Sequence, residues 1–166
     1  YMIEALGAYL KMCIAAGITP AEDYESIIDD LKVRVEKVFY NPDKLAYASK
    51  LCRGRLKDEY HEHTQVLMLY NNCVPEDKVA ALLDGITQSK FIPFSLSALP
   101  YLPFTVFGKQ KYNSELKQYT VKRIIETYTH MLTENTDTLW ETAKGGDDFY
   151  FAGSLSHAWS SLPVYL

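Results

Sequence analysis

The chain has 166 residues, a length typical of one ordinary domain. Hydrophobic residues make up 48% of it and charged residues 23%, which indicates a globular protein and excludes a disordered one. The formal net charge is −4 and no lysine- or arginine-rich run stands out, so nucleic acid and anionic membranes are not expected as partners. The 3 cysteines are an odd number without a CxxC pair and are interpreted as reduced packing residues.

The two ends of the chain have the pattern of internal sequence. Residues 1–6 (YMIEAL) resemble the middle of a helix, and the chain stops directly after an apolar motif. We therefore expect a piece of a longer protein, whose compartment cannot be inferred from this chain. Residues 91–107 carry no charge, but they contain three prolines and are too short for a membrane span, which needs about 20 residues.

Two helices are expected in the first forty residues, because apolar side chains recur there at helical spacing. Gly17 is well placed to end the first helix. Residues 19–22 (TPAE) fit a capping box that would begin the second helix, with Pro20 at its first position. Asn41-Pro42 would end it. The apolar faces consist of Ile3, Leu6, Leu10, Cys13 and Ile14 in the first helix, and Tyr24, Ile27, Ile28, Leu31, Val35 and Val38 in the second.

The middle of the chain predicts further helices. Residues 43–57 are interpreted as a short helix and a basic loop, and residues 58–72 as a third main helix. Residues 75–77 (PED) would open a fourth, with acidic side chains in the first turn, where the helix dipole favours them. The proline-broken stretch 91–107 is interpreted as a buried, interrupted helix.

The last long helix is expected over residues 114–133, followed by a left-handed turn at Asn135. No alternating strand of useful length and no repeat of fixed period is present. The predicted class is therefore all-α, built from antiparallel helix hairpins with short loops. The apolar face of the last helix would contain Val121, Ile124, Ile125, Tyr128 and Leu132.

Two short segments after this helix combine residue types that suit a carbohydrate site. Trp140 and Glu141 precede a loop rich in glycine and aspartate, and His157 and Trp159 lie in a cluster of small residues. A carboxylate can move a proton, an aromatic face can hold a sugar, and a histidine can bond either. Taken singly, Glu141 would be interpreted as a surface residue and His157 as a structural one.

Other chemistries have less support in the sequence. The serines near His157 are not preceded by a strand or a G-x-S-x-G elbow, so a serine nucleophile is not expected. His61 and His63 would point to different faces of a helix, and the HExxH pattern is absent, so we predict no metal site. Asp147 and Asp148 are interpreted as a solvated loop pair. No cofactor is implied.

The two segments resemble motifs of the bacterial α-L-rhamnosidases of glycoside hydrolase family 78. That family typically reads GAT[ST]xWE and then GSLCHGWSAxPVY, where this chain has NTDTLWE over 135–141 and GSLSHAWSSLPVY over 153–165. The joint occurrence of both motifs in this order is a specific signal. The likeness is close over residues 113–165 and loose over 1–112, where residues 62–65 (EHTQ) also look like a family segment.

The resemblance implies the C-terminal part of a six-hairpin catalytic domain, an (α/α)6 toroid of which the whole chain, residues 1–166, would supply about half. It implies an inverting hydrolysis of terminal α-L-rhamnosides, or a related sugar, with Glu141 as general base and the general acid on the missing half. Trp140 and Trp159 would wall the sugar pocket, His157 would bond at its edge, and His63 would also bind substrate. The isolated chain is expected to be inactive and to self-associate through its exposed half-barrel face.

Four positions depart from the family pattern. Asn135 replaces a glycine, Asp137 adds a charge near the base, and Ser156 and Ala158 replace cysteine and glycine. These departures bear on the identity of the sugar. Two alternative functions also stay open. One is another (α/α)-barrel enzyme, such as a glucuronyl hydrolase or lyase. The other is a non-catalytic helical interaction module, in which the four tryptophan, glutamate and histidine side chains would not converge.

Overall fold

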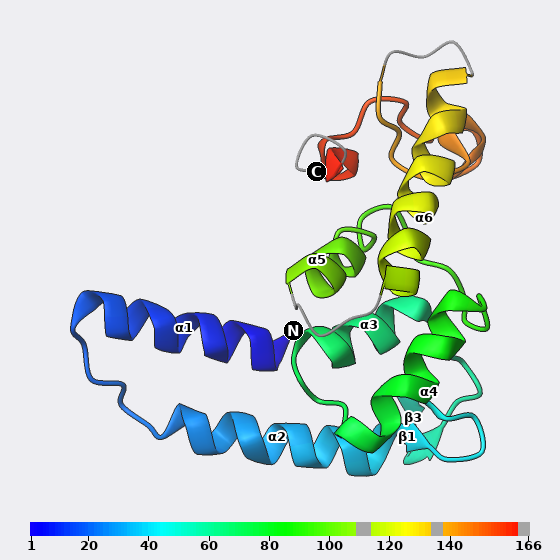
Figure 1. Cartoon of the computed structure of the whole chain (residues 1–166). Helices are drawn as coiled ribbons and strands as arrows, with labels where there is room; N and C mark the ends of the chain where they lie inside the picture. The colour runs from blue at the N-terminus through cyan, green and yellow to red at the C-terminus, as the bar shows by residue number, and fades with distance from the viewer. Residues whose placement is uncertain (109–113, 134–137, 163–166) are drawn as a thin grey trace. The chain divides into compact units, whose positions relative to one another are not determined.

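The computed structural model describes residues 1–108, 114–133 and 138–162 of the chain. It divides into two compact units, residues 1–86 and 87–166, each of which is described by itself (Figure 1). Most of the regular structure in the described residues is α-helical, which confirms the predicted helical class. Closure of such helices into a toroid stays a prediction. No described helix is both long and apolar enough to cross a membrane.

The first unit begins with an antiparallel helix hairpin, α1 (Met2–Ala16) and α2 (Tyr24–Phe39), whose helices lie side by side (Figure 1). Gly17 ends α1 in the left-handed conformation, with φ of 65°, as predicted. The N–H of the next residue, Ile18, donates to Cys13 O at 2.9 Å, which satisfies a carbonyl of the last turn.

The predicted start of the second helix is wrong by about one turn. Residues 19–22 are not helical, and Asp23 caps α2 instead. Its two carboxylate oxygens accept from the backbone N–H of Ser26 at 3.1 Å and from the Ser26 hydroxyl at 2.8 Å. These hydrogen bonds hold the pKa of Asp23 below its ordinary value. Because Asp23 satisfies a free helix N–H as well as a threonine would, the chain has two competing caps.

The short helix expected within residues 43–57 is also wrong, because two antiparallel β-hairpins occupy this region. The second hairpin turns through Arg53 and Gly54, whose φ values of 50° and 73° are both positive, as a tight two-residue hairpin turn requires. The four strands are β1 (Tyr40–Asn41), β2 (Ala46–Tyr47), β3 (Leu51–Cys52) and β4 (Arg55–Leu56).

Two more helices follow, α3 (Glu62–Tyr70) and α4 (Glu76–Thr87). α3 begins later than residue 58, because the preceding residues are bonded to the chain after β2: Ser49 N donates to Glu59 O at 2.8 Å. The acidic first turn predicted for α4 is present.

A buried glutamine joins α3 to the first hairpin. Gln65 is fully buried, and its side-chain oxygen accepts from Tyr47 N at 2.8 Å. Its amide nitrogen donates to Tyr47 O at 2.8 Å and to His61 O at 3.0 Å. Beside it, Glu36 accepts from the Tyr47 hydroxyl and pairs with Lys78. Polar side chains in this unit therefore satisfy backbone groups that two-residue strands leave unpaired.

The second unit contains α5 (Tyr101–Gly108) and α6 (Ser114–Thr133), which contact each other. The helix expected over residues 91–107 is present only from Tyr101, since Pro93 and Pro100 disfavour helix in the residues before them. The helix predicted over 114–133 is confirmed, but its expected face is divided. Ile124 and Tyr128 are buried, whereas the exposed members are Val121, Ile125 and Leu132.

Candidate functional site

The candidate site is built from two segments that follow α6, residues 138–141 and 153–160. Hydrogen bonds join them along their length: His157 N donates to Leu139 O at 2.8 Å, and the buried Ser160 hydroxyl donates to Trp140 O at 2.5 Å. Two short 3₁₀ helices, Gly145–Asp147 and Ala158–Ser160, lie in residues 138–162. The two sequence motifs are therefore adjacent in space.

Glu141 is held at three points by the second segment. Its backbone N–H donates to Ser154 O at 2.8 Å, and its carbonyl accepts from the Trp159 indole N–H at 2.9 Å. One carboxylate oxygen, Oε2, accepts from Ser154 N at 3.1 Å. The side chain is 21% exposed, so the carboxylate is fixed in orientation and still reaches solvent.

The other carboxylate oxygen faces a histidine that is stacked on an indole. Glu141 Oε1 lies 4.0 Å from His157 Nε2. The His157 ring stacks on Trp159 with ring centroids 3.9 Å apart and planes inclined by 30°. Because His157 Nδ1 accepts from Trp159 N at 3.5 Å, the ring proton of neutral His157 is assigned to Nε2, toward the carboxylate. Glu141, His157 and Trp159 thus form one cluster.

Trp140 has a different environment from Trp159. It is 7% exposed, whereas Trp159 is 45% exposed. Its ring meets His130 of α6 at a centroid distance of 5.1 Å and 90° between the planes. Gly145 approaches it so closely that an added Cβ would lie 2.6 Å from the indole. Its expected role as a wall of a sugar pocket stays a prediction.

The loop between the two segments is closed at its base and exposed at its tip. Ala152 N and Gly153 N both donate to Asp148 O at 3.1 Å, so Asp148 anchors the loop and is more than a solvated residue. A hydrogen bond from the Thr142 side chain and one from the Phe149 N–H hold the pKa of Asp148 below its ordinary value. At the tip, positive φ values and high exposure occur in Phe149, Tyr150 and Phe151.

His63 lies in the first unit, whereas the other four predicted site residues lie in the second. Its Nε2 is 2.8 Å from the Tyr1 hydroxyl, and the two rings meet edge to face. Burial, together with the charge of His61, lowers the pKa of His63 below its ordinary value. Its expected contact with substrate stays a prediction.

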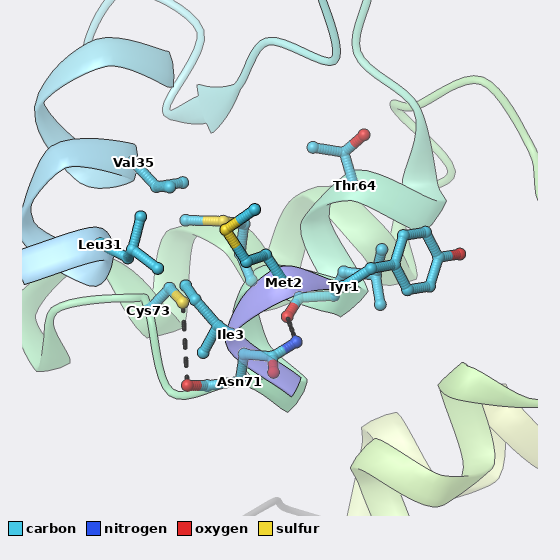
Figure 2. A pocket seen from close by; sticks show the side chains of 10 residues that line it. Tyr1, Met2, Ile3, Leu31, Val35, Thr64, Asn71 and Cys73 are labelled. Atoms are coloured by element: carbon cyan, nitrogen blue, oxygen red, sulfur yellow. Dashed lines mark hydrogen bonds between the residues drawn. The ribbon is translucent and has the colours of Figure 1, made fainter. Parts of the chain in front are cut away.

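A mainly apolar cavity of about 270 Å³ lies in the first unit. Figure 2 shows Met2 and Ile3 of α1 facing Leu31 and Val35 of α2 across it. Asn71, at its edge, donates to Leu67 O at 3.0 Å. Tyr1 and Thr64, also in the wall, bond to His63 and Ser49, so the polar side chains of the wall already have partners within the protein, which favours an apolar filling.

The described residues contain no group of three or more His, Cys, Asp or Glu side chains that could hold a metal ion. Several residues of the sequence motifs, Asn135, Asp137 and residues 163–165, lie outside the described part of the chain. Within it, sequence reasoning missed the contributions of His130 and Asp148. No sequence pattern marks these residues. His130 bonds to the backbone carbonyl of Ala143, and Asp148 accepts through its own backbone carbonyl, a group that every residue has.

Comparison with solved structures identifies the fold. The chain superposes on the crystal structure of a GH78 family rhamnosidase of Bacillus sp. GL1 with a TM-score of 0.83 and 21% sequence identity, covering 98% of this chain and 18% of that one. It also matches a rhamnosidase from Klebsiella oxytoca with rhamnose bound, with a TM-score of 0.68 and 15% identity, covering 86% of this chain and 27% of that one.

The resemblance to family 78 rhamnosidases is therefore confirmed at the level of the fold. The chain spans less than a third of the length of either solved structure. No protein-family model and no curated protein sequence matches it.

Proposed function

We propose that this chain is part of an α-L-rhamnosidase-like glycoside hydrolase whose parent removes terminal α-L-rhamnose, or a related sugar, with inversion. The observation that carries the proposal is the fold match over 98% of the chain to a family 78 rhamnosidase. The cluster of Glu141, His157 and Trp159 supports it, because it supplies a carboxylate, a hydrogen-bonding ring and an aromatic face together.

In the proposed mechanism Glu141 is the general base. It takes a proton from a water molecule as the water attacks the anomeric carbon of the sugar. The Ser154 N–H fixes Oε2, which leaves Oε1 and its neighbour His157 to meet the water and the substrate. A second carboxyl group, outside this chain, protonates the leaving oxygen from about 6.5–9.5 Å away.

The sugar is proposed to lie against Trp159, whose ring is 45% exposed while His157 stacks on it. Apolar C–H faces of sugars pack on indole rings, and the hydroxyl groups bond to polar side chains nearby. His157 supplies such a group here, and Trp140 and His63 are the further proposed contacts.

The first experiment titrates rhamnose into the 166-residue chain and follows binding by calorimetry. We expect Trp159→Ala to weaken binding at least tenfold, which corresponds to about 1.4 kcal/mol. Phe107→Ala is the matched control, because Phe107 is also 45% exposed and belongs to the same unit. Glu141→Gln should retain binding, since it keeps the shape of the side chain.

Measuring rhamnosidase activity tests the proposed general base, Glu141, separately from sugar binding. We expect no rhamnosidase activity from the isolated chain, because the proposed general acid is absent from it. Measurable hydrolysis that Glu141→Gln abolishes would contradict this expectation. Binding of a uronic acid in place of rhamnose would favour the glucuronyl hydrolase or lyase alternative, and binding of no sugar would favour an interaction module.

We also propose that two copies of the chain associate through α6. Its exposed apolar side chains Val121 and Ile125 line a surface groove of about 570 Å³. Lys122 and Glu126 line the same groove and pair with each other at 3.7 Å within one chain. An antiparallel twofold pairing of α6 would also set each of them against the opposite charge of the second copy. Light scattering should give a dimer that Ile125→Glu dissociates and Val33→Glu, on α2, does not. A monomer at high concentration would disprove the association.

A further inference from the structure

The side chain of His130, on α6, bonds to the loop that follows Glu141. It lies in the last turn of the helix, and its Nε2 is 3.0 Å from the carbonyl oxygen of Ala143. Its other ring nitrogen, Nδ1, is 3.0 Å from Thr127 O, one turn earlier in the same helix. The ring therefore ties the loop to a regular element.

The protonation state of His130 determines to which of the two carbonyls its ring donates. A neutral imidazole has one N–H, so it donates to one carbonyl only, whereas the protonated ring donates to both. With the proton on Nε2, His130 donates to Ala143 O, and the bond crosses from the helix to the loop. With both nitrogens protonated, the same ring also caps the carbonyl of Thr127.

His130 also contacts the residue before Glu141. Its ring meets the indole of Trp140 edge to face, with centroids 5.1 Å apart. Trp140 and Ala143 lie on either side of Glu141 in the chain, so one helical side chain holds both flanks of the carboxylate. The opposite face of this segment is held by the residues that follow Gly153, through Ser154 and Trp159.

A cavity beside His130 means that its contact with the loop at Ala143 depends on the hydrogen bond. His130 and Ala143 line a space of about 310 Å³, together with Thr127 and Arg123 of α6 and part of residues 93–99. Because the ring borders empty space, close packing alone does not hold the loop in place. Removing the donor should let residues 142–144 shift without an immediate steric barrier.

We infer that His130 is a positioning residue that fixes the orientation of Glu141, an inference that rests on the function proposed above for that carboxylate. It does not touch the reacting atoms. It acts through Trp140 and the Ala143 carbonyl, which set the path of the backbone on both sides of Glu141.

The test uses the two tryptophan indole N–H signals of the ¹⁵N-labelled chain. The Trp159 signal reports the orientation of Glu141, because its N–H donates to the Glu141 carbonyl. His130→Phe keeps an aromatic edge against Trp140 and removes both donors. His130→Gln keeps a donor near the Nε2 position. Circular dichroism verifies that each variant is folded.

We expect His130→Phe to move the signals of both tryptophans and His130→Gln to return the Trp159 signal toward its wild-type position. A purely local packing role would move the Trp140 signal alone. An unchanged Trp159 signal in folded His130→Phe would overturn the inference, as would a shift of equal size in His130→Gln.

Rhamnose titration of the same variants connects the inference to function. His130→Phe should weaken binding about fivefold, the size expected for one lost hydrogen bond, and His130→Gln should recover most of it. The indole signals need no sugar. If wild-type chain binds no rhamnose while the Trp159 signal responds as expected, the positioning role holds and the proposed function fails.

Discussion

The two units use opposite means to hold irregular backbone in place. In the first unit, the fully buried side chain of Gln65 supplies the donor and the acceptor that the backbone of Tyr47 needs. In the second, backbone hydrogen bonds such as Glu141 N to Ser154 O and His157 N to Leu139 O join the two segments, and glycines make the closest contacts. A side-chain bridge tolerates changes in nearby backbone, whereas a glycine contact tolerates no added atom. The two units should therefore fail under different substitutions.

The largest expected effect is on the side-chain bridge. Gln65→Leu should lower the free energy of unfolding of the first unit by about 3–5 kcal/mol, because several buried backbone groups lose their partners. The measurement is urea unfolding followed by circular dichroism. Gln88→Leu is the control, since Gln88 is exposed. Equal midpoints for the two variants would show that the bridge contributes nothing.

The glycine contact of the second unit should show a somewhat smaller effect. A Cβ at Gly153 would lie 2.0 Å from Gly145 O, which is backbone and cannot rotate away. Gly153→Ala should therefore cost about 2–3 kcal/mol. Gly146→Ala is the matched control, because its nearest neighbour would be 4.0 Å away. Tryptophan fluorescence during unfolding reports this unit, which contains both Trp140 and Trp159. If Gly153→Ala unfolds with the same fluorescence curve as the wild type, the close contact is refuted.

The smallest expected effect is a pH dependence confined to the first unit. Burial lowers the pKa of His63 in the folded chain, so the unfolded chain binds the proton more readily. Stability should therefore be constant above about pH 6.5, the unfolded value, and fall as the pH drops through the lower folded value. Melting temperatures between pH 7.5 and 5 should fall more for wild type than for His63→Gln. If the melting temperature falls by the same amount in His61→Gln and His63→Gln, the pH dependence does not come from His63.

Helices with a clear apolar period were predictable from the sequence. The ends of α1 at Gly17 and of α6 at Thr133 agree with the expected ranges, because a left-handed glycine and a long apolar stripe are strong local signals. The start of α2 was wrong because Thr19 and Asp23 offer the same capping chemistry. Only the tertiary fold decides between them.

The two hairpins before α3 could not be predicted, because strands of two residues have no periodicity. They depend on partners elsewhere, such as Gln65 for β2. The sequence motifs did identify Glu141, His157 and Trp159, which the fold brings together. His130 and Asp148 escaped notice because their roles depend on carbonyl oxygens, which every residue possesses.

The way Glu141 is held has a consequence for how such a site can change over time. Its N–H, its carbonyl and its carboxylate are all bonded to residues 154–159, across the base of a loop whose tip residue Tyr150 is fully exposed. Sequence inserted at Tyr150 would lengthen the loop without shifting the base beneath it. The loop is thus a module that evolution, or a protein engineer, can exchange while the carboxylate beneath it keeps its position.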